Sequence, residues 1–149
     1  MIYTPMTKTA LKLCFESHKD QTDKSGMPYV FHPFHLAEQM TDEKTTIVAL
    51  LHDVIEDTEY TIEELRNLGF DGDVLTAISL LTHNSDISYM EYVASIKTNK
   101  IAKVVKLADL RHNSDLTRLD IITEKDQKRA EKYLKAIKLL EENEQGGQI

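Results

Sequence analysis

The fold is decided by the stretch Val48-Ala49-Leu50-Leu51-His52-Asp53-Val54-Ile55-Glu56-Asp57. Its apolar residues predict a buried helix, yet this helix would also carry one histidine and three carboxylates. A helix turns by about 100° per residue, so relative to the histidine the acids Glu56, Asp53 and Asp57 lie at about 40°, 100° and 140°, all on one side. Because buried charges normally pair or bind a metal, the segment predicts either a site or a helix end with a buried histidine–aspartate pair and solvated acids.

The sequence on both sides of this stretch also predicts helices. Only five glycines and three prolines interrupt the chain, and no alternating strand pattern stands out. Capping residues predict helix starts, and these lie at Thr4-Pro5, His32-Pro33, Asp42, Thr61, Asp71, Ser88, Asn99 and Thr123. The last helix should bury the stripe Ala130, Tyr133, Leu134, Ile137 and Leu140. We expect an all-α, compact single-domain helical bundle over residues 1–149, with a frayed tail at about residues 144–149.

Composition limits the classes of function. The chain has 149 residues, 41% hydrophobic and 29% charged, and a formal net charge of −7 from 25 acids against 18 Lys plus Arg. This acidic balance argues against DNA or RNA as a partner, although a few cations or a metal could still hold a small anionic ligand. The start of the chain lacks a signal-peptide pattern, and no segment approaches the roughly 18 apolar residues of a membrane span. We therefore expect a cytoplasmic protein without a membrane partner. The single Cys14 excludes an internal disulfide and a multi-cysteine zinc site.

Two further segments place polar residues in apolar surroundings. Asp109 follows the apolar run that begins at Val104, and Asn113 lies one turn later on the same face. A salt bridge and a helix cap would also explain these two residues. The second segment is a basic loop around Lys24 that leads to His32 at a predicted helix start, where a cap or packed core histidine is the alternative to a ligand.

Taken together, these segments predict a metal site built from separate helices. The candidate ligands are two imidazoles and two carboxylates: His32, His52, Asp53 and Asp109. Such a set suits Mn²⁺, Fe²⁺ or Zn²⁺ with positions open for water. The neighbouring acids Glu56 and Asp57 could handle protons. By contrast, the spacing of Lys100, Lys103 and Lys106 predicts a solvated helix face, and a phosphate contact for Arg118 rests on position alone.

The flanking residues resemble a known family. The order His…His-Asp…Asp resembles the HD superfamily of metal-dependent phosphohydrolases. Three motifs are more specific: Lys24-Ser25-Gly26-x-Pro28-Tyr29-x-x-His32-Pro33, Leu51-His52-Asp53-Val54-Ile55-Glu56-Asp57-Thr58, and Val105-Lys106-Leu107-Ala108-Asp109 followed by His112-Asn113. They resemble the (p)ppGpp 3′-pyrophosphohydrolase domains of RelA/SpoT-type proteins and their stand-alone small relatives. The resemblance spans roughly Leu11 to Leu140.

The resemblance implies a role for each matching residue. His32, His52, Asp53 and Asp109 match the metal ligands, usually for one Mn²⁺ ion. Glu56 and Asp57 match the acidic pair that activates or orients the attacking water. Lys24, Ser25 and Asn113 match residues that line the nucleotide pocket. The implied fold is an all-α bundle, and the implied reaction converts ppGpp or pppGpp to GDP or GTP and pyrophosphate.

Two positions depart from the family pattern. Asp23 stands where the family often has a basic residue near the guanine base, and the order after the metal aspartate is Leu110-Arg111-His112-Asn113 instead of Arg-Leu-His-Asn. Asp23 therefore keeps a second enzyme hypothesis open, an HD phosphohydrolase for a dNMP, NADPH or a cyclic nucleotide. A third hypothesis is a non-catalytic sensor that binds an alarmone. The sequence does not predict the oligomeric state.

Overall fold

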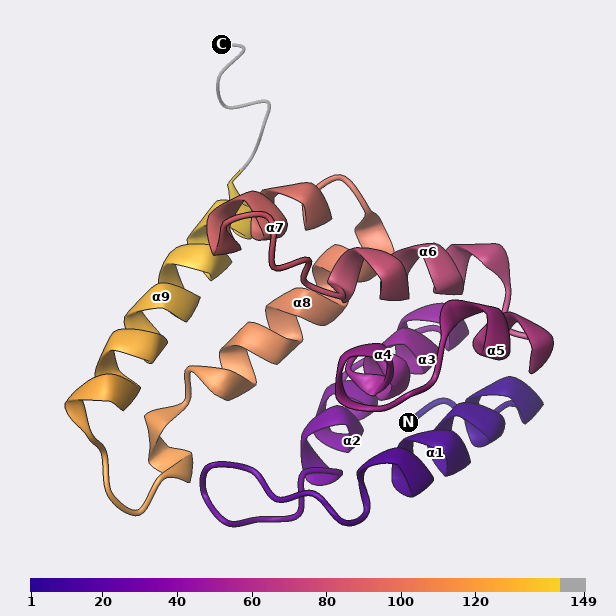
Figure 1. Cartoon of the computed structure of the whole chain (residues 1–149), viewed down its shortest axis with the longest axis horizontal. Coiled ribbons are helices and arrows are strands. Elements are labelled where there is room, and N and C mark those ends of the chain that lie inside the picture. The colour runs from indigo at the N-terminus through magenta and orange to yellow at the C-terminus, as the bar shows by residue number, and fades with distance from the viewer. Residues whose placement is uncertain (143–149) are drawn as a thin grey trace, which may run out of the picture.

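The structure is a computed structural model that describes residues 1–142 and shows helices without any strand in that range. In chain order the elements are α1 (Pro5–His18), α2 (Phe31–Glu38), α3 (Glu43–Leu51), α4 (Val54–Asp57), α5 (Ile62–Asn67), α6 (Gly72–Leu81), α7 (Tyr89–Ile96), α8 (Lys100–Asn113), the 3₁₀ turn η1 (Leu116–Arg118) and α9 (Glu124–Glu141) (Figure 1). The predicted all-α fold is confirmed. The predicted frayed tail lies outside the described residues.

Side-chain caps account for most of the helix starts. Thr4, Thr61 and Thr123 each form a reciprocal capping box with the residue three positions later. The side chains of four other N-cap residues accept a backbone N–H in the first turn: Asp42, Asp71, Ser88 and Asn99. All seven starts were predicted at these residues, because the signal for a cap is local in sequence.

The prediction of one continuous helix through the deciding stretch is wrong. Helix α3 ends at Leu51, His52 is its C-cap, and Asp53 is the N-cap of the short helix α4. The His52 ring lies against the end of its own helix, with Nδ1 2.7 Å from the Ala49 carbonyl oxygen. The angular positions expected for an unbroken helix therefore do not describe Asp53, Glu56 and Asp57.

Helix α3 lies at the centre of the bundle. Every residue from Thr45 to Leu51 is buried, and α3 contacts α1, α2, α6 and α8. Helix α8 runs between α3 and α9 and contacts both (Figure 1). The N-terminus of α2, the C-terminus of α3 and the C-terminal half of α8 therefore meet inside the bundle, which positions the site described below.

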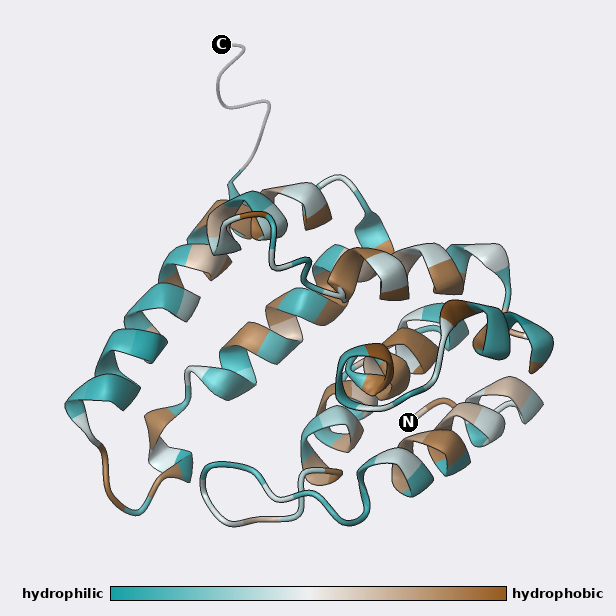
Figure 2. Cartoon of the chain, viewed as in Figure 1, coloured by the Kyte–Doolittle hydropathy of each residue, from teal (hydrophilic) through white to brown (hydrophobic). Residues whose placement is uncertain are grey.

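Helix α9 buries only part of its predicted stripe. Figure 2 shows mostly hydrophilic residues along it, and its buried residues are Ala130, Ala136 and Leu140. Leu134 was expected in the buried stripe but is 56% exposed. Among the described residues, no helix combines the length and apolar character needed to cross a membrane.

Candidate active site

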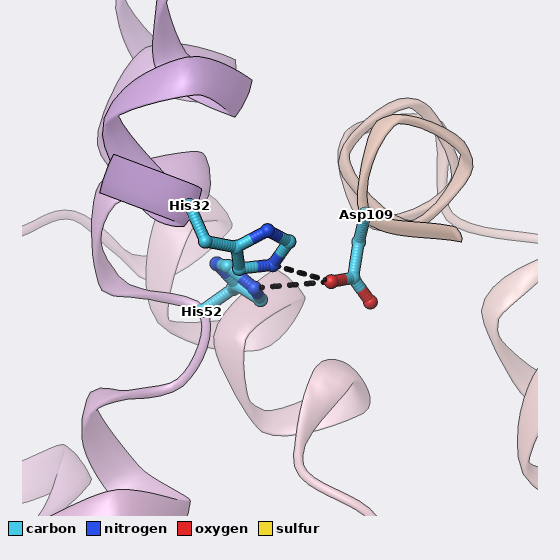
Figure 3. Close-up of side chains that lie close together, drawn as sticks. All are labelled: His32, His52 and Asp109. Atoms are coloured by element: carbon cyan, nitrogen blue, oxygen red, sulfur yellow. Dashed lines mark hydrogen bonds and ion pairs between the residues drawn. The ribbon is translucent and has the colours of Figure 1, made fainter. Parts of the chain in front are cut away.

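Three helices bring together two histidines and one aspartate in the interior. His32 comes from the first turn of α2, His52 from the end of α3 and Asp109 from α8 (Figure 3). One potential ligand atom from each residue lies within 4.8 Å of the other two, and all three residues are buried. Asp109 Oδ1 is 2.8 Å from His32 Nε2 and 3.6 Å from His52 Nε2. The three side chains therefore point their donor atoms at one another.

The surroundings of His52 fit a metal ligand. A carbonyl oxygen can only accept, so the 2.7 Å contact with Ala49 places the proton on His52 Nδ1. In the neutral ring, His52 Nε2 then carries a lone pair, and this buried atom has no hydrogen-bond partner. Burial lowers the pKa of His52, but the Asp53 and Asp109 carboxylates together raise it well above its ordinary value. A cation at this place, either a proton or a metal ion, would satisfy a lone pair that faces two carboxylates.

Asp53 lies beside this group without belonging to the mutually close set. Its Oδ2 is 3.0 Å from His52 Nε2 and accepts a hydrogen bond from the Tyr29 hydroxyl. Burial raises the pKa of Asp53, but His52 and the Tyr29 hydroxyl lower it to about 2. Asp53 is therefore a carboxylate at neutral pH, oriented by Tyr29 next to the histidine.

Asp109 is held in place through both of its oxygens. Oδ1 accepts from Asn113 Nδ2 at 3.0 Å, and Oδ2 lies 2.9 Å from Lys106 Nζ. Burial raises the pKa of Asp109, but Lys106 and the two histidines lower it well below its usual range. The expectation that Lys106 lies on a solvated face is wrong, since only 12% of its side chain is exposed. The signal in the sequence was its position three residues before Asp109 in a helix.

His112 is a neighbour of the site for which the sequence suggested no role. Its Nδ1 lies 2.7 Å from His32 Nδ1, and the two rings are within 10° of parallel. Burial, together with the charges of Arg118, His32 and His35, lowers the pKa of His112 to about 4. Because His112 also lies three residues from Asp109 in α8, helical spacing could have indicated that it faces the same region.

The acidic pair Glu56 and Asp57 lies on α4, just after the histidine–aspartate step, and both residues are exposed. Glu56 Oε1 accepts a hydrogen bond from the backbone N–H of His83. Burial, together with the Asp53 and Glu56 carboxylates, raises the pKa of Asp57 to about 6. Asp57 is thus mostly a carboxylate at pH 7 but a stronger base than an ordinary aspartate.

A cavity of about 420 Å³ adjoins this group. Its walls include all three residues expected to bind substrate, Lys24, Ser25 and Asn113. Tyr29 also lines it, and Tyr29 and Asn113 hydrogen-bond to Asp53 and Asp109 respectively. Tyr29 and Asn113 therefore connect the cavity to the histidine–aspartate group, so a ligand in the cavity would lie next to the candidate metal centre.

Both carboxylate oxygens of Asp23, a residue of the cavity wall, have hydrogen-bond partners. Its Oδ1 accepts from the Ser25 backbone and hydroxyl and from the Met27 backbone. Its Oδ2 pairs with Arg118 at 3.0 Å, and Arg118 also donates to the His112 carbonyl. Burial raises the pKa of Asp23, but the hydrogen bonds from Ser25 and Met27 and the charge of Arg118 lower it below its ordinary value. Asp23 thus fixes the loop before α2 and links it to η1.

Comparison with known proteins identifies the family to which this fold belongs. The HD domain family matches residues 10–112, a span that contains His32, His52, Asp53 and Asp109. This chain belongs to the HD domain family. The HD motif itself is the pair His52-Asp53, the step at which α3 ends and α4 begins.

Relatives of this HD domain include two much longer bacterial proteins. The chain is 37% identical over 132 residues to "GTP pyrophosphokinase" of Streptomyces coelicolor, covering 78% of this chain and 15% of that protein. It is 35% identical over 140 residues to "Guanosine-3′,5′-bis(diphosphate) 3′-pyrophosphohydrolase" of Borreliella burgdorferi, covering 83% of this chain and 20% of that protein. The chain therefore spans a fifth or less of the length of these two relatives.

A solved structure matches the HD domain over nearly its whole length. Its description reads "A metazoan ortholog of SpoT hydrolyzes ppGpp and plays a role in starvation responses". The match has a TM-score of 0.77 and 25% sequence identity, and it covers 95% of this chain and 88% of the other.

Proposed function

We propose that this HD domain is a metal-dependent hydrolase that removes the 3′-diphosphate of ppGpp or pppGpp, giving GDP or GTP and pyrophosphate. The observation that carries the proposal is the convergence of His32, His52 and Asp109 beside a cavity lined by Lys24 and Asn113. The names of the relatives support this substrate class, since one is a guanosine-3′,5′-bis(diphosphate) 3′-pyrophosphohydrolase and the matching structure is described as hydrolysing ppGpp.

We propose that one divalent ion is held by His32, His52, Asp53 and Asp109. Imidazole and carboxylate donors suit Mn²⁺, and they also suit Fe²⁺ or Zn²⁺. When bound, such an ion lowers the pKa of water and offsets the charge of a phosphate group. The lone pair of His52 Nε2, buried without a hydrogen-bond partner, supports this assignment.

The remaining residues would handle the proton and the substrate. We propose that Glu56 and Asp57 orient the attacking water and accept its proton, and the raised pKa of Asp57 suits a base near neutral pH. Attack of the water oxygen on the phosphorus bonded to ribose O3′ forms a new P–O bond and breaks the bond between that phosphorus and O3′. The proton that the acids accept from the water is then available for O3′, and pyrophosphate leaves. Lys24 would offset charge on the substrate, and Ser25 and Asn113 would hydrogen-bond to it.

The test is pyrophosphate release from ppGpp with added Mn²⁺, measured with and without a chelator. We expect release by the wild type, none with chelator and none by His52→Ala. The Glu56→Gln/Asp57→Asn double variant should lose roughly 10²–10⁴-fold in rate if these acids transfer the proton. Glu131→Gln is the matched control, because it makes the same kind of change to an exposed carboxylate on α9. A double variant with unchanged kcat would refute the assignment of the acids.

A second candidate function follows from the charges around the cavity. Three cations line it, Lys24, Arg118 and Arg129, and three carboxylates also line it, Asp23, Asp115 and Asp126. Two of the cations are already paired within the wall, Arg118 with Asp23 at 3.0 Å and Arg129 with Asp126 at 3.1 Å. This balance favours a substrate with fewer phosphates than ppGpp, such as a dNMP, NADPH or a cyclic nucleotide. Phosphate release from a dNMP or NADPH, or opening of a cyclic nucleotide to the nucleoside monophosphate, without pyrophosphate release from ppGpp, would select this function.

We also propose that the protein works in the cytoplasm on a small nucleotide, without DNA or RNA as a partner. The excess of 25 acids over 18 Lys plus Arg supports this proposal. A non-catalytic sensor would need no water-activating acids. Failure of the purified protein to take up any first-row divalent metal would favour the sensor over both enzymes.

A further inference from the structure

Both candidate ligand histidines need a partner that orients the ring and fixes the nitrogen that carries the proton. Each presents Nε2 to Asp109, and each has its Nδ1 next to a second partner. A histidine that binds a metal through Nε2 must carry its proton on Nδ1, and it normally donates that proton to a neighbouring acceptor. For His52 the acceptor is the carbonyl oxygen of Ala49 at 2.7 Å. For His32 the atom in the corresponding place is Nδ1 of His112, also at 2.7 Å.

We propose that His112 is a positioning residue, which accepts the Nδ1 proton of His32 and so holds Nε2 of His32 toward the metal. The proposal deepens the proposed function, because it rests on a metal ion at His32, His52 and Asp109. Of two imidazole nitrogens 2.7 Å apart, one has to donate and the other to accept. His112 then carries its own proton on Nε2.

His112 is fixed well enough to do this. It lies in the last turn of α8, and its backbone carbonyl accepts a hydrogen bond from Arg118 at 3.0 Å. The His35 ring packs against it, with ring centroids 4.4 Å apart. The near-parallel arrangement of the His32 and His112 rings keeps their Nδ1 atoms in reach of each other. With its backbone anchored by Arg118 and its ring in contact with His35 and His32, His112 can act as the backbone carbonyl does for His52.

Two substitutions separate this role from simple packing. In His112→Asn the amide oxygen can occupy about the place of Nδ1 and still accept a proton. His112→Leu has nearly the same shape as asparagine but offers no acceptor. We expect His112→Leu to bind Mn²⁺ and Zn²⁺ roughly 10–100-fold more weakly than the wild type, and His112→Asn to regain most of the affinity.

The measurement is calorimetric titration of the metal-free protein with the inorganic ion alone, together with urea unfolding of each metal-free variant. Wild-type affinity in His112→Leu, or an equal loss in both variants, would overturn the proposal. Because this readout uses no nucleotide, a wild type that binds the ion but releases no pyrophosphate from ppGpp would refute the proposed function and leave this inference standing.

A second measurement does not depend on the variants folding. ¹⁵N NMR of the histidine rings in the wild type loaded with diamagnetic Zn²⁺ reports which nitrogen of each ring carries the proton. We expect a protonated Nδ1 in His32 and an unprotonated Nδ1 in His112. The opposite assignment for this pair would overturn the proposal.

Discussion

Lys106→Met tests whether the ion pair between Lys106 and Asp109, next to the candidate metal centre, stabilises the metal-free protein. In the wild type, Lys106 Nζ lies 2.9 Å from Asp109 Oδ2 and 5.2 Å from the centre of the Tyr92 ring. The exposed fractions of the two paired side chains are 12% and 7%. Burial lowers the pKa of Lys106, but Asp109 more than offsets this, so the pair is charged at pH 7. Methionine keeps the aliphatic packing and removes the cation.

The expected loss follows from the carboxylate that remains. Breaking a buried ion pair by removing one partner costs about 3–5 kcal/mol. Asp109 keeps a hydrogen bond from Asn113 and contacts with two histidines that can take up a proton, so we expect the lower value, about 3 kcal/mol. At roughly 2–4 °C per kcal/mol for a chain of this size, Tm should fall by about 6–12 °C. A bound divalent ion would stand in for the lost charge and reduce this difference.

The assay is urea unfolding followed by circular dichroism at pH 7 with chelator present. The matched control is Lys103→Met, one turn earlier in α8, where the amine makes no ion pair with any residue between 1 and 142. Adding Asp109→Asn to Lys106→Met should recover part of the loss, with a coupling of about 1–3 kcal/mol between the two sites. A loss below about 1 kcal/mol for Lys106→Met, or strict additivity in the double variant, would refute the reasoning.

Three further predictions concern other parts of the site. Because the pKa of Asp57 is about 6 in the fold and 3.8 ordinarily, the folded state binds more protons between these values, and this group lowers stability as pH rises from about 4 to 6. Asp57→Asn should therefore stabilise the metal-free protein at pH 7 by about 1 kcal/mol, a value reduced for solvent screening because Asp57 is exposed. Equal shifts of the urea midpoint at pH 4 and pH 7 would contradict this prediction. Removing the metal with chelator should lower the Tm of the wild type but not that of His52→Ala. The bound ion should stabilise the wild type by about 2.7 kcal/mol when its concentration is a hundredfold above Kd. A Tm shift of equal size in both proteins would place the ion elsewhere. Asp23→Ala removes the acceptor for Ser25, Met27 and Arg118, so the free energy of unfolding should fall by roughly 1–3 kcal/mol, and an unchanged value would show that the loop does not depend on Asp23.

The helices could be predicted from the sequence because their signals are local. Caps such as Asp42 and Asn99 act on N–H groups within three residues, so the sequence alone identifies them. The buried stripe of α9 was less certain, because Leu134 fits the spacing of the stripe yet lies exposed. Spacing within one helix shows which residues share a face, but it does not show how wide the contact with the neighbouring helix is.

The partners within the site could not be predicted in the same way. The His32–His112 contact joins residues 80 positions apart, and the Asp23–Arg118 pair joins residues 95 positions apart. Nothing in either local segment specifies the other. Lys106 shows a second limit. Its contact with Asp109 is local, three residues apart in α8, but its spacing also fits a solvated face, and only the packing of α8 against its neighbours buries the pair.

The break between α3 and α4 is part of the site's chemistry. In a helix that continued through Asp53, the Ala49 carbonyl would accept the backbone N–H of Asp53 four residues later. Because α3 ends at Leu51, Ala49 is among the last four residues of the helix, whose carbonyls have no helical partner. The His52 ring uses that carbonyl and thereby places its proton on Nδ1 and its lone pair on Nε2. His32 begins its own helix and has no such carbonyl in contact with its ring, so its Nδ1 needs a side chain, and His112 is the one that the fold supplies.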